Sequence, residues 1–198
     1  LHSFPTRRSS DLEKALQVFV EEGYTDTTYQ KIADRCGITR TILYIYFKNK
    51  REIFLYSIKR FTEALETELK AIIARNNCSN REKLESVTQM IIETCGANAK
   101  LLQIIVEYLQ HLAKAGVDTA ERVRRRIIRL RHLLAGIIIA GQKSGEFEQH
   151  LQIKAAIDFF YILIESIVVR VALLQASNLS EVKNLSNTFI AMLCKNRA

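Results

Sequence analysis

The sequence predicts an all-α protein of about nine helices, and three observations support this fold class. The 198 residues include one Pro and seven Gly, so few residues interrupt helices. Hydrophobic residues make up 48% of the chain, and they recur mostly at intervals of three and four, the period of an amphipathic helix. Ser, Thr, Asn or Asp precedes many of these segments, and Gly follows several of them. Because a chain of this length is near the limit for one hydrophobic core, we expect two domains.

Residues 1–11 differ from the segments that follow, because they carry no helical period. They contain the run Ser-Phe-Pro-Thr-Arg-Arg-Ser-Ser-Asp, which is what in-frame translation of a common sequencing adapter would give. We therefore expect a non-native or disordered tail, and the alternative is a basic arm that binds DNA. The first helix is expected to begin at Leu12 and to stop at Gly23, which favours a left-handed helix end.

Two short helices are expected next, over residues 28–36 and 40–47. Gly37 lies in the turn between them, and Thr39 precedes the second helix as its cap. This arrangement fits a helix-turn-helix, in which the second helix enters the major groove of DNA. The residues expected to point inward are Ile32, Ala33, Cys36, Leu43 and Phe47.

A long fourth helix is expected to begin near Asn49, because Glu52 follows it at the spacing of a capping box, and to end near Arg75. Further caps and stops predict five more helices, over residues 79–96, 99–113, 118–144, 152–175 and 180–194. The last two are apolar on too many sides for an isolated amphipathic pair, so another surface must cover them.

A longer pattern runs through the helix-turn-helix segment: Gly23-Tyr24 … Thr27-Thr28 … Ile32-Ala33 … Gly37-Ile38-Thr39 … Leu43-Tyr44-Ile45-Tyr46-Phe47-Lys48-Asn49-Lys50. It resembles the signature of the TetR family of repressors, in motif detail over about residues 12–61. The remaining chain is similar to the family only in helix count, helix lengths and a Gly-Glu-Phe that ends at Phe147. The resemblance implies a DNA-binding domain over residues 12–50 and a ligand-binding and dimerisation domain over residues 51–198.

The resemblance also implies roles in DNA binding. Thr28 is similar to the family's phosphate-contacting residue, and a helix N-terminus suits an anion. Arg40 and Thr41 match positions that reach base edges, and Ile45 is able to pack on a thymine methyl group. Family members usually have Thr where Ile42 stands, so one hydroxyl contact is absent. The expected DNA contacts are Thr27, Thr28, Tyr29, Arg40, Thr41, Tyr44, Ile45, Tyr46, Lys48 and Lys50.

Several of these residues also have plainer interpretations. Tyr44 and Tyr46 fit backbone contacts, because phenol hydroxyls donate to phosphate, but half-buried packing is the alternative. Lys48 and Lys50 fit phosphate contacts or a solvated face. Tyr29 fits a phosphate contact and packing equally.

Proteins similar to this one bind small, often apolar or amphipathic molecules among their sensor helices, and the ligand moves the two recognition helices of a dimer apart. Candidate ligand contacts, each also a candidate for core or dimer packing, are Tyr108, Phe159, Tyr161 and Glu165. In the family the last two helices form a four-helix interface with a second subunit. The candidates for this interface are Phe160, Ile164, Ile167, Val168, Phe189 and Leu193.

The chain is basic, with a formal net charge of +8 and a pI near 9.4. This balance indicates a polyanionic partner, most often nucleic acid and less often an anionic membrane surface. A basic run from Arg122 to Arg131 spreads around more than half of the expected helix, which favours a solvated face. The alternatives are a subsite for an anionic ligand and a second DNA contact.

Other function classes lack their sequence signals. The four Cys lie far apart with no paired His, which argues against a metal site or a disulfide framework. The chain has no P-loop, dinucleotide fingerprint, zinc-protease motif or nucleophile elbow, so we expect neither an enzyme nor a cofactor. With no transmembrane or signal-peptide stretch, the expected compartment is the cytoplasm.

Together these features predict a sequence-specific transcriptional regulator that acts as a homodimer on double-stranded DNA. A repressor is expected, released from a palindromic operator by an unidentified small-molecule effector. The first alternative is a ligand-independent or weakly specific DNA-binding protein. A membrane-surface helical protein is the second, although it would not need the turn and cap residues of the helix-turn-helix.

Overall fold

The computed structural model describes residues 8–176 and 178–195, apart from the side chains of residues 8–10, 12 and 119–127. Within this part the chain forms nine α-helices and no β-strand. The predicted all-α fold class is therefore confirmed.

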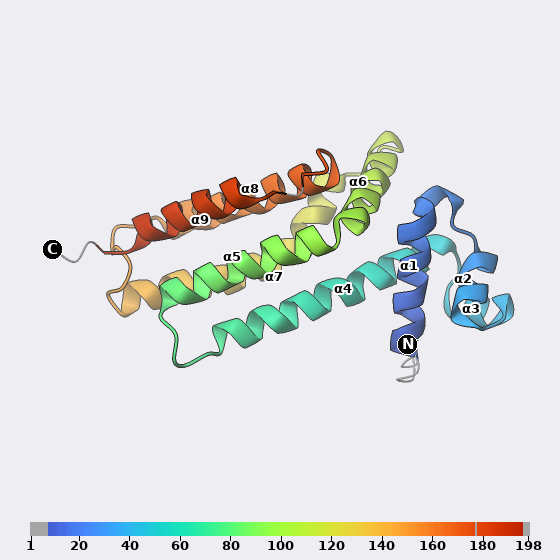
Figure 1. The fold of residues 1–198 in the computed structure, drawn as a ribbon, viewed down its shortest axis with the longest axis horizontal. Coiled ribbons are helices and arrows are strands. Elements are labelled where there is room, and N and C mark those ends of the chain that lie inside the picture. Colours follow the sequence, from blue (N-terminus) through green and yellow to red (C-terminus); the bar gives the residue numbers. More distant parts are fainter. Residues whose placement is uncertain (1–7, 177, 196–198) are drawn as a thin grey trace. The chain divides into compact units, whose positions relative to one another are not determined.

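Packing divides the chain into two compact units, residues 1–65 and 66–198. The first unit contains a 19-residue helix, two short helices and the start of a long fourth one, drawn in blue to blue-green in Figure 1. These helices are α1 (Arg8–Asp26), α2 (Tyr29–Cys36), α3 (Arg40–Tyr46) and α4 (Lys50–Ile73). The buried side chains that hold them together include Ala15, Val18, Phe19, Ile32, Ala33, Leu43, Phe47, Ile53 and Phe54. All five residues predicted to point inward from the two short helices are buried.

The first helix begins earlier than the sequence pattern indicated. It starts at Arg8 rather than Leu12, so residues 8–11 of the expected tail are helical, whereas residues 1–7 lie outside the described residues. Its regular dihedral angles break at Gly23 (φ 80°, ψ 165°), the expected stop, before the last turn ends at Asp26.

The start of α4 carries the predicted cap. The Asn49 side chain accepts a hydrogen bond from the Glu52 N–H (3.0 Å). The Glu52 carboxylate accepts one in return, from the N–H of Lys48 (2.7 Å) rather than that of Asn49. The exchange satisfies donors that the first turn of a helix leaves without a partner.

The second unit contains the rest of α4 and five further helices, of which α8 and α9 run side by side (Figure 1). The five are α5 (Asn80–Ala97), α6 (Ala99–Lys114), α7 (Thr119–Lys143), α8 (Ile153–Ala172) and α9 (Ser180–Leu193). The core lies among α5, α7, α8 and α9, and its fully buried members include Leu84, Val87, Ile137, Ile138, Ile167 and Ile190. The expected helix start near residue 79 is confirmed, and Ser79 and Glu82 form a complete capping box there at the start of α5.

A short segment after α7 ties helix ends of this unit together. The buried ring of Phe147 packs against Gly141 of α7, where a Cβ atom would lie only 2.2 Å from the ring's Cδ2. Gly141 is therefore required by the close approach of the ring, since no real Cβ tolerates that distance.

The neighbouring Glu146 closes the N-terminus of α5. Its carboxylate accepts hydrogen bonds from the N–H groups of Asn80 (2.9 Å) and Arg81 (2.7 Å). Burial alone would raise the pKa of Glu146, but these bonds, with those from the side chains of Asn80 and Ser79, outweigh it and hold the pKa below its ordinary value. The charged carboxylate also suits the positive end of the helix dipole.

The same segment pairs with the end of α9. The Glu148 N–H donates to the carbonyl of Leu193 (2.9 Å), and the Lys195 N–H donates to the carbonyl of Glu146 (3.0 Å). The C-terminal ends of α7 and α9 and the N-terminal end of α5 are thus held at one place.

Candidate DNA-binding surface

The ends of α2 and the start of α3 are fixed by three caps. At the start of α2 the Thr28 hydroxyl accepts a hydrogen bond from the Lys31 N–H (3.2 Å). At the start of α3 the Thr39 hydroxyl accepts one from the Ile42 N–H (3.4 Å). Between them Gly37 adopts the left-handed conformation (φ 68°, ψ 33°), which side chains other than that of Gly disfavour. The predicted cap and stop signals are confirmed, and they hold the two helices in a helix-turn-helix.

The outer face of α3, which we define as Thr41, Ile42 and Ile45, points away from the core of the first unit. At about 100° per residue, these side chains lie on the side of the helix opposite the inward Leu43 and Phe47. Ile45 is 70% exposed and Ile42 40% exposed, and Thr41 is exposed too. The surface that this helix presents to solvent is therefore rich in methyl groups.

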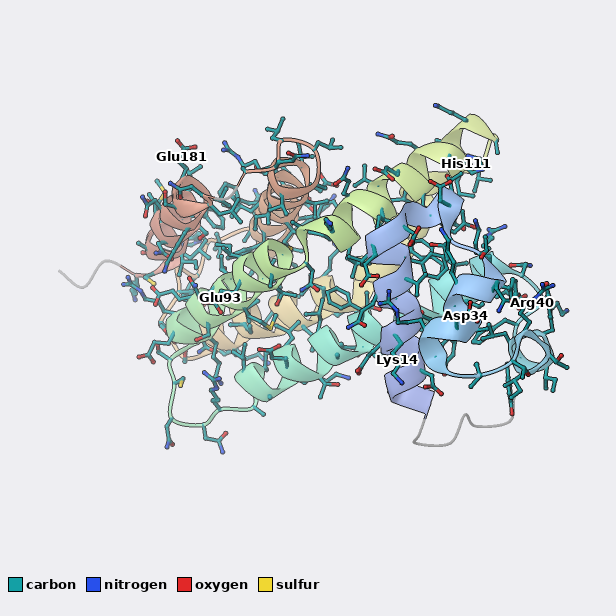
Figure 2. The ribbon with its side chains drawn as sticks, turned by 45° about the vertical axis from the view of Figure 1, so that its right-hand side comes forward. Lys14, Asp34, Arg40, Glu93, His111 and Glu181 are labelled. Atoms are coloured by element: carbon teal, nitrogen blue, oxygen red, sulfur yellow. The ribbon has the colours of Figure 1, made fainter. Side chains whose placement is uncertain are left out.

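Polar and aromatic side chains flank the outer face of α3. Arg40, the first residue of the helix, is exposed and lies at the outside of the first unit (Figure 2). Tyr44 and Tyr46 lie on opposite sides of Ile45 around the helix and are 51% and 36% exposed. This places one phenol on each side of the methyl-rich face.

Tyr44 is held in place by Tyr29 of α2. The two rings stack with centroids 4.4 Å apart and an interplanar angle of 13°, and the Tyr29 hydroxyl donates a hydrogen bond to the carbonyl of Phe47 (3.1 Å). Burial, followed by the proximity of Tyr44 and Glu52, raises the pKa of Tyr29, so the hydroxyl keeps the proton that it donates. Tyr29 therefore has the packing role that the sequence left as an alternative, and it orients Tyr44.

Lys50, the first residue of α4, is engaged inside the unit. Its ammonium donates hydrogen bonds to the carbonyls of Tyr24 (2.7 Å) and Thr25 (2.8 Å) at the end of α1. It also lies 4.9 Å from the centroid of the Tyr24 ring, a cation–π distance. Burial lowers the pKa of Lys50, and the nearby Asp26 acts in the opposite direction. The family resemblance implied a phosphate contact for Lys50. In the structure its ammonium joins α4 to α1 instead.

Thr27 does not present its side chain to DNA, contrary to the sequence prediction. It is only 1% exposed, and its hydroxyl donates to the carbonyl of Gly23 (2.6 Å). The prediction is wrong for this side chain, because its one donor is used to hold the end of α1. Thr28 and Lys48 are exposed and stay predicted contacts.

A family model described as bacterial regulatory proteins, tetR family, matches residues 12–56. The match spans the helix-turn-helix, the outer face of α3 and the Lys50 contacts. This segment of the chain is therefore a tetR-type helix-turn-helix domain.

Two curated TetR-type relatives extend the match beyond the first unit. The fatty acid metabolism regulator protein of Bacillus subtilis (strain 168) is 26% identical over 161 residues, which cover 79% of this chain and 79% of that protein. The HTH-type transcriptional repressor KstR2 of Rhodococcus jostii (strain RHA1) is 26% identical over 153 residues, or 77% of this chain and 74% of that protein. The chain is accordingly a DNA-binding transcriptional regulator.

Solved TetR-type structures share the whole fold. A TetR transcription regulator from Haloarcula marismortui ATCC 43049 superposes with a TM-score of 0.80 at 17% identity, covering 94% of this chain and 100% of that one. The regulator FadR from Bacillus subtilis, in complex with stearoyl-CoA, gives a TM-score of 0.71 at 21% identity, covering 96% and 99%. The second unit therefore has the fold of a TetR sensor domain.

The sensor domain contains two small apolar depressions, which share Leu134 and Ile164. One lies among α5, α7 and α8 and is also lined by Val87, Ile91 and Phe160. The other lies between α7 and α8. Each has room for little more than one water molecule.

The four predicted ligand contacts do not converge on one site in the described structure. Tyr161 lines the second depression, whereas Tyr108 is buried on α6 and Glu165 is exposed. Phe159 stacks on Phe189 of α9, with ring centroids 3.7 Å apart. That contact is the core packing which the sequence kept as an alternative.

The basic run on α7 is described only at its C-terminal end, since the side chains of residues 119–127 lie outside the described part. Arg129 forms an ion pair with Glu66 at 3.2 Å. Arg131 pairs with Asp158, and its guanidinium lies 5.4 Å from the Tyr161 ring centroid. These two arginines therefore contact their own sensor domain.

Three of the residues predicted for the dimer interface are buried inside their own subunit. Phe160, Ile167 and Leu193 are each at most 4% exposed, so they belong to the core of their own subunit, which contradicts the prediction for these three. On α8 the face was misassigned because that helix is apolar on several sides and its period alone does not identify the outward one. Ile164, Val168 and Phe189 are half-buried and stay predictions.

A different set of apolar side chains is exposed on α8, just after it, and on α9. Leu185 and Met192 of α9 are 57% and 74% exposed and lie seven residues apart on one side of the helix. A second exposed stripe lies on and just after α8, with its members seven and four residues apart. We call the whole set the α8–α9 apolar face; it consists of Ile162, Val169, Leu173, Leu185 and Met192.

Among the described residues, no helix has a stretch with the length and hydropathy of a membrane span.

Proposed function

We propose that the protein is a homodimeric repressor that binds a palindromic operator and leaves it when an acyl-CoA thioester enters the sensor domain. The observation that carries the DNA-binding part is the capped turn that presents the outer face of α3, flanked by Arg40, Tyr44 and Tyr46. We propose neither an enzymatic activity nor a cofactor for the protein. We expect it to act in the cytoplasm, where bacterial DNA lies.

The proposed contacts divide into two groups. Arg40 binds a guanine edge, for which its planar guanidinium is the best-suited side chain. Thr28, Tyr44, Tyr46 and Lys48 bind phosphates and set the register on the duplex. Tyr29 and Lys50, by contrast, keep the helices in position without contacting DNA.

Dimerisation through the α8–α9 apolar face would place two recognition helices one DNA turn apart, about 34–36 Å. An exposed apolar face of this kind is typical of a subunit interface. Charge inserted there, as in Met192→Lys, is expected to yield a monomer by analytical ultracentrifugation and to abolish high-affinity operator binding. Lys substituted for the exposed Ile128 of α7 is the matched control.

The ligand class is proposed from the relatives and from the character of the sensor domain. One curated relative is a fatty acid metabolism regulator, and one structural neighbour was solved with stearoyl-CoA. The depression among α5, α7 and α8 is lined almost entirely by aliphatic and aromatic side chains, the surface that an acyl chain requires. Its closed state means that an acyl chain has to displace Leu134 and Ile164 as it enters.

The test begins with selection of duplexes from a random pool, followed by binding to the selected operator in the presence of stearoyl-CoA. We expect a palindrome with half-sites one turn apart, and release of the protein by stearoyl-CoA but not by free CoA. An ordinary allosteric coupling would lower operator affinity about 5- to 150-fold. Arg40→Ala should weaken binding to the operator about 10- to 100-fold and to random DNA much less. Equal losses on both would remove its role in specificity.

A matched pair of variants tests the ligand pocket. Ile164→Val removes one methylene from both depressions and should increase stearoyl-CoA affinity, by up to about fourfold. Ile138→Val removes the same group from a core position that lines neither depression, and should lower stability by about 1 kcal/mol with no gain in affinity. Equal effects of the two variants would contradict an acyl site at the depressions.

The second candidate function is a DNA-binding regulator that responds to no ligand, and the small size of both depressions favours it. It predicts an operator from the same selection but no release by stearoyl-CoA or by acyl chains of other lengths.

A further inference from the structure

The recognition helix has few groups that are able to form hydrogen bonds with base edges. Helix α3 has the sequence Arg-Thr-Ile-Leu-Tyr-Ile-Tyr and contains no Asn, Gln, Asp or Glu. Asn and Gln are the side chains that bind adenine through two hydrogen bonds, and carboxylates accept from cytosine. Without them, base-edge hydrogen bonding from this helix rests on Arg40 and the Thr41 hydroxyl. The helix therefore has no side chain that binds the adenine of an A·T pair through two hydrogen bonds.

The middle of the exposed surface of α3 is apolar instead. Ile42 and Ile45 lie three residues apart, so they share one side of the helix, and both are exposed. The core of the unit lies on the other side, where Leu43 and Phe47 are buried. In the major groove the one apolar feature of a base edge is the thymine C5-methyl group.

We infer that Ile42 and Ile45 make the protein specific for thymine methyl groups, so that each operator half-site contains thymine opposite these two side chains and a guanine near Arg40. This inference rests on the proposed function, because it takes α3 to be the helix in the major groove. A protein partner on the same face fits less well, because Arg40 and Lys48 add positive charge at its edges and the two exposed tyrosines add hydroxyl donors.

Deoxyuridine gives a direct test, because it differs from thymidine only by lacking the C5-methyl group and keeps every hydrogen-bonding group. The operator is first selected from a random pool and then resynthesised with deoxyuridine at one thymine position at a time. Each contacted methyl group that is lost should lower affinity about fourfold, and loss at the same position in both half-sites about fifteenfold. These measurements use the unsubstituted protein, so they do not depend on the folding of a variant.

Variants then assign the effect to residues. In Ile45→Ala, the deoxyuridine effect should disappear at the thymine opposite Ile45 and persist at the thymine opposite Ile42. In the Ile42→Ala and Ile45→Ala double variant, the thymidine and deoxyuridine operators should bind with nearly equal affinity. Ile128→Ala removes a similarly exposed isoleucine from α7 and should keep the full difference. A deoxyuridine effect below twofold at every position overturns the inference, as does an effect that persists in the double variant. Selection that yields no motif contradicts the proposed function itself, whereas a motif without methyl dependence contradicts only this inference.

Discussion

Replacing Lys50 with Met should destabilise the first unit. It should leave the contacts between that unit and the DNA phosphates unchanged. The substitution keeps most of the aliphatic stem but removes the ammonium, and with it the hydrogen bonds to Tyr24 and Thr25 and the cation–π contact. Hydrogen bonds from charged groups contribute about 1.5–3 kcal/mol when they are buried. Since Lys50 is only half-buried, we expect the whole set to contribute about 1–2 kcal/mol.

Lys48 provides a matched control two residues away. Its side chain is exposed, and within the described residues no hydrogen bond or ion pair engages its ammonium. Lys48→Met should therefore leave the free energy of unfolding nearly unchanged. If Lys48 binds a phosphate in each half-site, its loss should reduce the slope of log affinity against log salt by about 1.8 for a dimer.

Two assays separate the two lysines. Urea denaturation followed by far-ultraviolet circular dichroism gives the free energy of unfolding, and operator binding at several salt concentrations gives the slope. The structure predicts that Lys50→Met changes the first quantity and Lys48→Met the second. The reasoning is refuted if Lys50→Met lowers the salt slope as Lys48→Met does and leaves stability unaltered, because Lys50 would then be the phosphate contact that the family resemblance implied.

Three further predictions concern stability and the DNA-binding surface. Gly141→Ala should lower the free energy of unfolding by about 1–3 kcal/mol, because the new methyl group overlaps a buried ring. Gly136→Ala in the same helix meets open space and should raise the free energy of unfolding by up to about 1 kcal/mol. Thermal denaturation of the two variants checks these opposite signs. Because folding holds the pKa of Glu146 below its unfolded value, the stability that this carboxylate contributes is present above about pH 4.3 and is lost as pH falls through the folded pKa. Glu146→Gln should make the urea midpoint less dependent on pH in that range, and an unchanged dependence would contradict this. Tyr29→Phe keeps the stacked ring and should retain most operator affinity, whereas Tyr29→Ala should lose severalfold more by gel shift; equal losses would show that the hydroxyl, not the stack, matters.

The local signals of the helix-turn-helix were predictable because each acts over a few residues. A hydroxyl three residues before an N–H donor and a glycine at a helix end determine their own geometry, so the caps at Thr28 and Thr39 and the left-handed Gly37 were found where the sequence placed them. The same holds for the inward Leu43 and Phe47, which follow from the helical period.

Contacts between residues distant in sequence were not predictable in this way. The Lys50 ammonium bonds carbonyls about 25 residues earlier in the chain, and nothing in the spacing of the sequence indicates that these atoms meet. On α8 the sequence offered apolar residues on several sides, and only packing against α5 and α9 shows that Phe160 and Ile167 point inward and Ile162 outward. A family motif therefore gives the type of residue at a position, whereas its partner depends on the rest of the fold.

The closed packing of the sensor domain limits how a ligand can act on DNA binding. The proposed acyl ligand has to displace Leu134 and Ile164, so it binds only to protein molecules in which these side chains have moved apart. If that open form is the minor state, the apparent affinity falls by the fraction that is open, so an opening free energy of about 2.7 kcal/mol would weaken the ligand about 100-fold. The ligand shifts DNA binding only to the extent that open and closed forms differ in operator affinity. A tightly packed sensor with a small coupling would therefore need a large apolar ligand, and a long acyl chain supplies more buried area than a compact effector.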